Sequence, residues 1–172
     1  GLLDQSLREF VAQEDQILNP AFFGVVAATP SGTCIHNMAG QRSETFQQVI
    51  AQDPWVAVKD SLWRFFDPKT LNYFGSEYDT ILLQGPFATG YRQDSCFVFF
   101  GQQHVRKMVA PSSIEFVPGK DGAAFLVVGQ RERKIIYNHQ GQKLFTTTFD
   151  KVQYAGDELF IVQKREKKGL MT

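Results

Sequence analysis

A short polar motif occurs twice in the chain, and it constrains the fold more than any other feature of the sequence. Asn37 to Arg42 reads NMAGQR, and Asn138 to Lys143 reads NHQGQK. Asn at the first position and Gly at the fourth are typical of a type I turn, and the Gly can adopt the left-handed conformation that closes a bulged hairpin. Because apolar runs flank both copies, the motif predicts two β-hairpin turns that belong to one repeated unit.

The features around these turns recur in a constant order. Two large apolar residues stand three apart at four places, and these pairs begin at Phe46, Tyr78, Ile114 and Phe149. Dense apolar strands are expected at residues 22–28, 54–58, 96–100, 124–128 and 159–163. A recurrence of roughly 35 residues is typical of repeat architectures. We therefore expect an all-β fold of antiparallel, repeated β-hairpins in four to five partial units.

The last part of the chain resembles a known family of repeats. The segment KIIYNHQGQKLFTTTFDKVQYAGDELFIVQKREKKGLM, Lys134 to Met171, resembles the WG-repeat family of bacterial proteins. In that family a Trp-Gly-Leu/Ile strand leads to an Asp-x-x-Gly turn, an aromatic-Asp pair and an apolar strand. Lys168-Gly169-Leu170 keeps the Gly-Leu step with Lys in place of the Trp, and Phe149-Asp150 and Tyr78-Asp79 match the aromatic-Asp step. The resemblance covers residues 22 to 172 and implies an all-β array used for binding or display, without catalytic residues.

The N-terminal segment has a different pattern. Its apolar residues follow helical spacing, and Asn19-Pro20 ends the run; these residues are Leu3, Leu7, Phe10, Val11, Ile17 and Leu18. We expect a helix over residues 1–20 that caps one end of the array, followed by a single compact β-repeat domain over residues 21–172. An amphipathic helix on a membrane surface is the weaker alternative, because Arg8 is the one cation on its polar face.

Composition and charge exclude several classes of protein. Aromatic residues, sixteen of them Phe, are abundant and favour β-structure. Eighteen basic and eighteen acidic residues give a formal net charge of zero, which disfavours a nucleic-acid partner. No stretch is long and apolar enough to predict a membrane span. Because the chain begins with Gly1, a processed terminus or a tag-cleavage scar is indicated. The location is left open, with an extracytoplasmic or cell-surface location slightly favoured.

The sequence contains no convincing constellation for catalysis or for a metal. His36 and His139 lie on or beside equivalent turn positions, so we expect both to be exposed turn residues rather than ligands. The hydroxyls of Ser31 and Thr33, near Cys34 and His36, could suggest a nucleophile site, but a turn between strands accounts for these residues without chemistry. Cys34 and Cys96 are expected to be small buried hydrophobes, and a disulfide remains open if the fold brings their strands together. We expect no catalytic residue, no cofactor and no metal site.

The residues from Gln84 to Ser95 are expected to form a long loop on the β-scaffold. Long loops concentrate binding residues, and Tyr and Arg dominate binding hot spots. Phe87, Tyr91 and Arg92 are therefore the candidate binding residues. The alternative is that Phe87 and Tyr91 fold back and pack in the core.

Two cationic segments are secondary candidates. His104, Arg106 and Lys107 form one possible patch. The run QKREKKG, Gln163 to Gly169, is expected to be a solvated hairpin tip, with a contact patch for an anionic partner as the alternative.

Three functions compete. The first is a non-catalytic binding or scaffold module that presents a β-repeat surface to a protein or glycan. The second is a barrel-like carrier that holds an apolar small molecule among its phenylalanines. The third, an enzyme, would require His36 or His104. The spacing leaves open whether the array is closed, barrel-like or open, and terminal strand edges would allow self-association.

Overall fold

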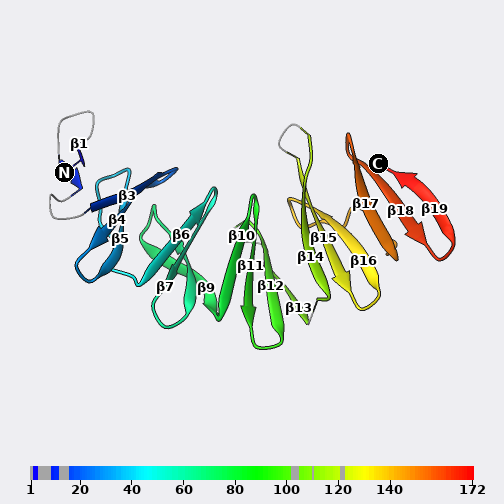
Figure 1. Ribbon diagram of the computed structural model, residues 1–172, viewed down its shortest axis with the longest axis horizontal. Coiled ribbons are helices and arrows are strands. Elements are labelled where there is room, and N and C mark those ends of the chain that lie inside the picture. Colours follow the sequence, from blue (N-terminus) through cyan, green and yellow to red (C-terminus); the bar gives the residue numbers. More distant parts are fainter. Residues whose placement is uncertain (1, 4–8, 12–15, 102–104, 110, 121–122) are drawn as a thin grey trace. The chain divides into compact units, whose positions relative to one another are not determined.

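The computed structural model describes residues 2–3, 9–11, 16–101, 105–109, 111–120 and 123–172, and every regular element within these ranges is a β-strand (Figure 1). The chain forms two compact units, Gly1–Leu83 and Gln84–Thr172. The division between the units falls inside a strand near the middle of the chain. The single compact domain expected over residues 21–172 stays a prediction.

The strands are short and follow one another closely along the chain. The first unit contains β1 (Leu2–Leu3), β2 (Glu9–Val11), β3 (Gln16–Ala21), β4 (Gly24–Thr29), β5 (Gly32–Asn37), β6 (Gln48–Gln52), β7 (Trp55–Lys59), β8 (Trp63–Asp67) and β9 (Asn72–Tyr78). The boundary crosses β10 (Thr80–Gln84). The second unit contains β11 (Phe87–Arg92), β12 (Ser95–Phe100), β13 (Val105–Val109), β14 (Ser113–Pro118), β15 (Ala124–Gln130), β16 (Arg133–Asn138), β17 (Lys151–Gly156), β18 (Leu159–Lys164) and β19 (Lys167–Met171).

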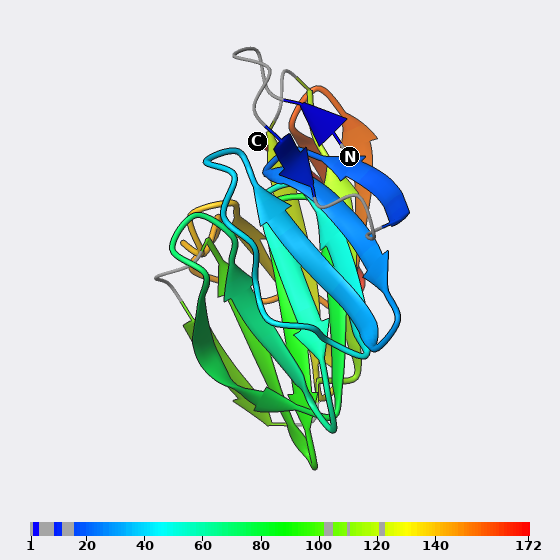
Figure 2. The same ribbon diagram turned by 90° about the vertical axis from the view of Figure 1, so that its left-hand side faces the viewer.

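Each sheet joins strands that are neighbours in sequence. The described strands form the sheets β1-β2, β3-β4-β5, β6-β7-β8-β9, β10-β11-β12-β13, β14-β15-β16 and β17-β18-β19. Figure 2 shows the blue strands of β3-β4-β5 in front of the cyan strands that follow them in the first unit. The prediction of an all-β fold made of antiparallel hairpins is confirmed. The five sheets with three or four strands agree with the four to five units expected from the sequence.

The dense apolar segments of the sequence are the inner strands of these sheets. They correspond to β4, β7, β12, β15 and β18, and each of them has a partner strand on both sides. Along β15, Leu126 and Val128 face one apolar cluster, whereas Phe125 and Val127 face another. Successive side chains on a strand point to opposite faces. A strand whose two faces are both buried must therefore be apolar throughout, which accounts for the run AFLVV.

The helix predicted over residues 1–20 is wrong wherever the structure describes that segment. Leu2–Leu3, Glu9–Val11 and Gln16–Ala21 are strands, and the rest of the segment lies outside the described residues. β3 crosses residue 20 and pairs antiparallel with β4, from Gln16 opposite Ala28 to Ala21 opposite Gly24. Without β3, the buried strand β4 would have one edge of unpaired backbone groups. The requirement to pair that edge outweighs the helical spacing of the apolar residues.

The two Asn-x-x-Gly motifs form the same turn. The carbonyl of each Asn accepts a hydrogen bond from the amide of its Gly, at 2.9 Å in the first turn and 3.0 Å in the second. The side-chain oxygen of each Asn accepts hydrogen bonds from the backbone amides two and four residues later. Its side-chain amide donates to the side chain of the Gln four residues later, which is Gln41 or Gln142. Gly40 and Gly141 have φ angles of 76° and 77°, in the left-handed region that Gly adopts readily. The repeat inferred from the sequence is therefore confirmed at the level of individual hydrogen bonds.

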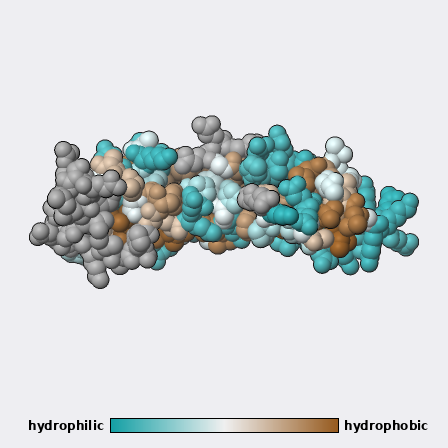
Figure 3. Space-filling model, turned by 90° about the horizontal axis from the view of Figure 1, so that it is seen from above, coloured by the Kyte–Doolittle hydropathy of each residue, from teal (hydrophilic) through white to brown (hydrophobic). Residues whose placement is uncertain are grey.

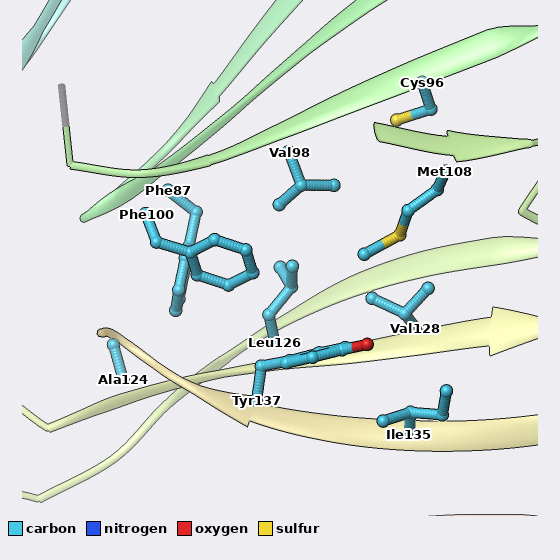
Figure 4. Close-up of a cluster of buried hydrophobic side chains, with 10 residues drawn as sticks. All are labelled: Phe87, Cys96, Val98, Phe100, Met108, Ala124, Leu126, Val128, Ile135 and Tyr137. Carbon is cyan, nitrogen blue, oxygen red and sulfur yellow. The ribbon is translucent and has the colours of Figure 1, made fainter. Parts of the chain in front are cut away.

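Aromatic rings fill much of the core of each unit. In the second unit, the rings of Phe87 and Phe100 meet edge to face with centroids 5.7 Å apart, beside Leu126 and Tyr137 (Figure 4). Phe125 and Phe160 make a similar contact at 5.1 Å. Such edge-to-face pairs contribute about 0.5–1.5 kcal/mol beyond the burial of their area. The phenylalanines thus pack against one another.

Candidate functional site

The long loop predicted between Gln84 and Ser95 is wrong, because most of its residues form β11. This strand pairs with β12 along its whole length, from Phe87 opposite Phe100 to Arg92 opposite Ser95. Gly85 and Gln93 have φ angles of 57° and 51° and lie in tight turns. The glycines and polar residues that indicated a loop therefore serve two turns and the strand between them.

The three binding candidates of that segment have different surroundings. Phe87 is 0% exposed and belongs to the core, so it offers no surface to a partner. Tyr91 is half-buried, packs against the same cluster and lies opposite Cys96. Arg92 is exposed. Packing of Phe87 and Tyr91, the alternative left open by the sequence, is confirmed, while a binding role for Tyr91 or Arg92 stays a prediction.

The second candidate patch lies on β13. Arg106 is half-buried, with its guanidinium 5.0 Å from the ring centre of Tyr137, and it donates to the carbonyl of Gly141 at 3.4 Å. This side chain therefore holds the second Asn-x-x-Gly turn against β13. Lys107 is exposed, with its ammonium 5.7 Å from the ring centre of Phe97. His104 lies outside the described residues.

The prediction that both turn histidines are exposed is correct for His139 and wrong for His36. His36 is 3% exposed, and its Nε2 lies 3.5 Å from the Sγ of Cys34. The alignment of the two repeats could have predicted the burial of His36. His36 precedes Asn37 as Tyr137 precedes Asn138, and both preceding residues are buried.

Both cysteines are buried, as predicted, and neither forms a disulfide bond in the described structure. Burial raises the pKa of the Cys96 thiol to about 11, and its hydrogen bond with Tyr91 opposes part of that rise. A thiol with this pKa carries little thiolate near neutral pH, and it is therefore a poor nucleophile.

A shallow groove on the second unit brings together three lysines from separate strands. Its volume is about 410 Å³, and β17 and β18 form most of it. The groove is lined by Lys134, Lys151, Val152, Gln153, Ile161, Val162, Gln163 and Lys168. None of these lining residues carries a carboxylate. The groove is thus locally cationic, although the chain as a whole has no net charge.

The strand register arranges the exposed side of this sheet in two rows. Lys151 lies opposite Gln163, which lies opposite Lys168; the next row consists of Gln153, Ile161 and Leu170. We call these six residues the outer face. The alternate residues Val152 and Val162 also line the groove, but they belong to the apolar cluster on the other side of the sheet, so the groove is not confined to the outer face.

The outer face combines cationic and apolar surface. Ile161 is 39% exposed and Leu170 is 68% exposed, and they lie directly opposite each other on β18 and β19. Figure 3 shows hydrophilic surface beside a hydrophobic patch at the right-hand end, where Figure 1 draws β17, β18 and β19. The neighbouring sheet β14-β15-β16 buries apolar side chains on both of its faces. The outer face therefore differs from an inner sheet in keeping apolar side chains at the surface.

Sequence reasoning found the hairpin next to the outer face but missed the face itself. The run from Gln163 to Gly169 contains the β18-β19 turn as expected, with Lys164 opposite Lys167 and Arg165 at a φ of 55°. The groove lysines, however, come from three different strands and are not adjacent in sequence. The alternation of polar and apolar residues in Lys151-Val152-Gln153-Tyr154 was the signal available in the sequence.

A second polar cluster lies on the first unit. The hydroxyl of Tyr73 donates to Oε1 of Glu44, and the guanidinium of Arg64 stacks 3.7 Å from the centre of the Tyr73 ring. Arg64 also pairs with Asp60 at 3.2 Å. Burial, and then the hydrogen bond with Glu44, raise the pKa of Tyr73 to about 12, while Arg64 opposes the rise. A phenol that keeps its proton so firmly is suited to a structural hydrogen bond rather than to proton transfer.

The described residues contain neither a cluster of metal-binding side chains nor a helix that could span a membrane. No group of three or more His, Cys, Asp or Glu side chains is placed to hold a metal ion within those residues. Over the same part of the chain, no helix has the length and apolar character needed to cross a membrane.

Comparisons with known proteins identify no family. No protein-family model matches the chain, and no curated protein matches it. One solved structure to which the chain is similar is "KlHsv2 with loop 6CD replaced by a Gly-Ser linker", with 14% sequence identity and a TM-score of 0.37. The similarity covers 85% of this chain and 60% of the other, so the chain spans less than two thirds of that protein's length. At this TM-score the likeness supports no argument about fold or function.

Proposed function

We propose that the chain is a non-catalytic binding module of the WG-repeat type, which presents the outer face of its C-terminal sheet to a protein partner. The observation that carries the proposal is the exposed Ile161–Leu170 pair beside Lys151 and Lys168. Apolar side chains that lie at the surface with polar residues around them are typical of protein–protein interaction sites.

The scaffold behind this face supports a role in display. β17, β18 and β19 pair continuously, and the inner side of the sheet packs on an apolar cluster that includes Phe160 and Val162. A sheet held in this way fixes the positions of its outward side chains before a partner arrives, which reduces the ordering cost of binding. The resemblance of Lys134–Met171 to WG repeats points in the same direction, because the family implies binding or display.

The partner chemistry favours a protein over a glycan. None of the six residues of the outer face has an aromatic ring on which a sugar could stack, whereas the face offers lysine, glutamine and aliphatic side chains. The carrier of an apolar small molecule remains the alternative, and a thermal-shift screen with lipophilic ligands discriminates it. A carrier would be stabilised by such ligands, but the packing of Phe125 on Phe160 and of Phe87 on Phe100 gives that alternative no support.

An affinity capture from extracts of the source organism tests the proposal. The double variant Ile161→Asp with Leu170→Asp should lose a partner that the wild-type chain retains. Val105→Asp with Val109→Asp is the matched control, because these valines are 45% and 67% exposed on β13 of the same unit. Loss of the partner from the control but not from the outer-face variant would contradict the proposal, as would equal capture by all three proteins.

A further inference from the structure

We infer that the partner of the outer face is an acidic, extended peptide segment with carboxylates on alternate residues, which pair with Lys151 and Lys168. This inference rests on the proposed function, because it names the partner chemistry for the same surface.

The groove is positively charged. Three lysines line the groove, and its lining residues carry no acidic group to neutralise them. The acidic residues at the two ends of β17 have contacts elsewhere. The Oδ2 of Asp150 accepts a hydrogen bond from the backbone amide of Arg165, and Asp157 pairs with Lys120 at 3.2 Å. Among the residues that the structure describes, the three groove lysines form no ion pair, so their charge is available to an external anion. Complementary charge both steers association and rejects wrong partners.

The distance between Lys151 and Lys168 is compatible with an extended peptide. Lys151 and Lys168 lie in one cross-strand row with Gln163 between them. Neighbouring strands are about 4.8 Å apart, so the backbones of the two lysines are separated by about 10 Å. In an extended peptide, residues i and i+2 are on the same face and are about 7 Å apart. Flexible lysine side chains cover the difference. Gln163 donates from its Nε2 to the carbonyl of Arg165 at 3.0 Å, and its Oε1 can accept from a backbone amide of the peptide between the two carboxylates.

The row of Gln153, Ile161 and Leu170 favours a peptide over a small anion. Ile161 and Leu170 lie beside the lysine row and are exposed. A small inorganic polyanion has no apolar group to place there, whereas a peptide can lay aliphatic or threonine side chains against both residues. A lipid surface would use the same lysines, but a groove lined by Gln153 and Gln163 offers amides that suit a peptide backbone.

A direct binding titration tests the inference. The probe is a fluorescein-labelled peptide in which Glu and Thr alternate, because Thr favours extended structure. Its anisotropy is measured with the full chain at low and at physiological salt. We expect Lys151→Glu with Lys168→Glu to weaken binding at least about tenfold, because attraction is replaced by repulsion at two positions. The matched control Lys107→Glu with Lys143→Glu reverses two exposed lysines of the same unit outside the groove, and it should change the affinity less than about twofold.

Two further probes separate the sources of negative charge. A peptide in which Gln replaces each Glu should not bind, whereas equal binding of both peptides would overturn the inference. Tighter binding of inorganic polyphosphate, or of phosphatidylserine-containing vesicles, than of the Glu-Thr peptide would also overturn it. Lys134→Gln should weaken peptide binding by a smaller factor than the double charge reversal, because that half-buried lysine lines the groove from β16 and lies outside the outer face.

The experiment separates failure of this inference from failure of the proposed function. Suppose that Ile161→Asp with Leu170→Asp abolishes capture of a partner but Lys151→Glu with Lys168→Glu leaves that capture intact. The proposal that the outer face binds a protein is then supported, and the inference that the partner is an acidic peptide is overturned. If neither outer-face variant affects capture, the proposed function itself fails. A far-UV circular dichroism spectrum equal to that of the wild type confirms for each variant that the sheet is folded.

Discussion

The twin Asn-x-x-Gly turns allow one stability prediction to be worked out in detail. Asn37 and Asn138 make the same three local side-chain hydrogen bonds. Asn37 differs in that it is 3% exposed and donates a further bond to the carbonyl of Pro68 at 2.9 Å. Asn138 is half-buried and its side-chain bonds are exposed. Replacement by Ala should therefore cost more free energy of unfolding at position 37 than at position 138.

The magnitudes follow from the bonds that are lost. Asn138→Ala removes two backbone-amide contacts whose donors can turn to water, a loss of about 1–2 kcal/mol. Asn37→Ala removes the same contacts and also leaves the buried Pro68 carbonyl without this donor, which adds about 1–3 kcal/mol. Since folded domains are stable by about 5–15 kcal/mol, both changes are measurable.

Urea unfolding provides the assay. Both tryptophans, Trp55 and Trp63, lie in the first unit, so fluorescence reports the effect of Asn37→Ala, and far-UV circular dichroism reports both units. Gln41→Ala and Gln142→Ala form the matched control pair, because each removes one exposed partner of its Asn. Their costs should be equal and below about 1 kcal/mol. Equal costs for the two Asn variants, or a larger cost at position 138, would refute the reasoning.

Three further predictions follow from other contacts. Phe160→Ala should destabilise the chain by about 3–5 kcal/mol in urea unfolding, because this ring is 0% exposed and packs on Phe125; a cost below about 1 kcal/mol would show that the core is wrongly described. The raised pKa of Tyr73 favours its protonated form in the folded state, so its stabilising contribution is complete below pH 10 and is lost as pH rises towards about 12. The difference in stability between the wild type and Tyr73→Phe should therefore shrink over that interval, and a difference that grows there would contradict the assignment. Because the Cys96 thiol is buried with a pKa of about 11, it should not react with a thiol reagent in the native protein at neutral pH, but should react after unfolding.

The sequence predicted most of the fold because its signals were local and repeated. The Asn-x-x-Gly motif specifies its own turn, since nearly all of its bonds lie within five residues. The dense runs could be assigned because a strand buried on both faces has to be apolar. The N-terminal helix was predicted on equally local grounds, but β3 contains the last residues of the periodic pattern and pairs with β4, which lies just beyond that pattern, and this pairing outweighs the helical spacing.

The candidate site was harder to predict, because it depends on register. Which residues of β17, β18 and β19 share a face is fixed by the pairs Lys151–Gln163 and Gln163–Lys168, and no short motif encodes such pairs. The loop prediction failed for a related reason. Gly85 and Gly90 resemble loop residues in sequence, but Gly85 serves a turn, and Gly90 lies within the fully paired strand β11 opposite Phe97.

Hydrogen–deuterium exchange of the full chain, with and without the alternating Glu-Thr peptide, shows directly whether the outer face binds an acidic peptide. We expect slower exchange of backbone amides within Lys151–Met171 when the peptide is bound, and unchanged exchange in β13. The Lys151→Glu, Lys168→Glu variant should show no such protection. Protection that falls on β11 or β13 instead, or equal protection in the variant, would contradict the assignment of the outer face as the binding surface.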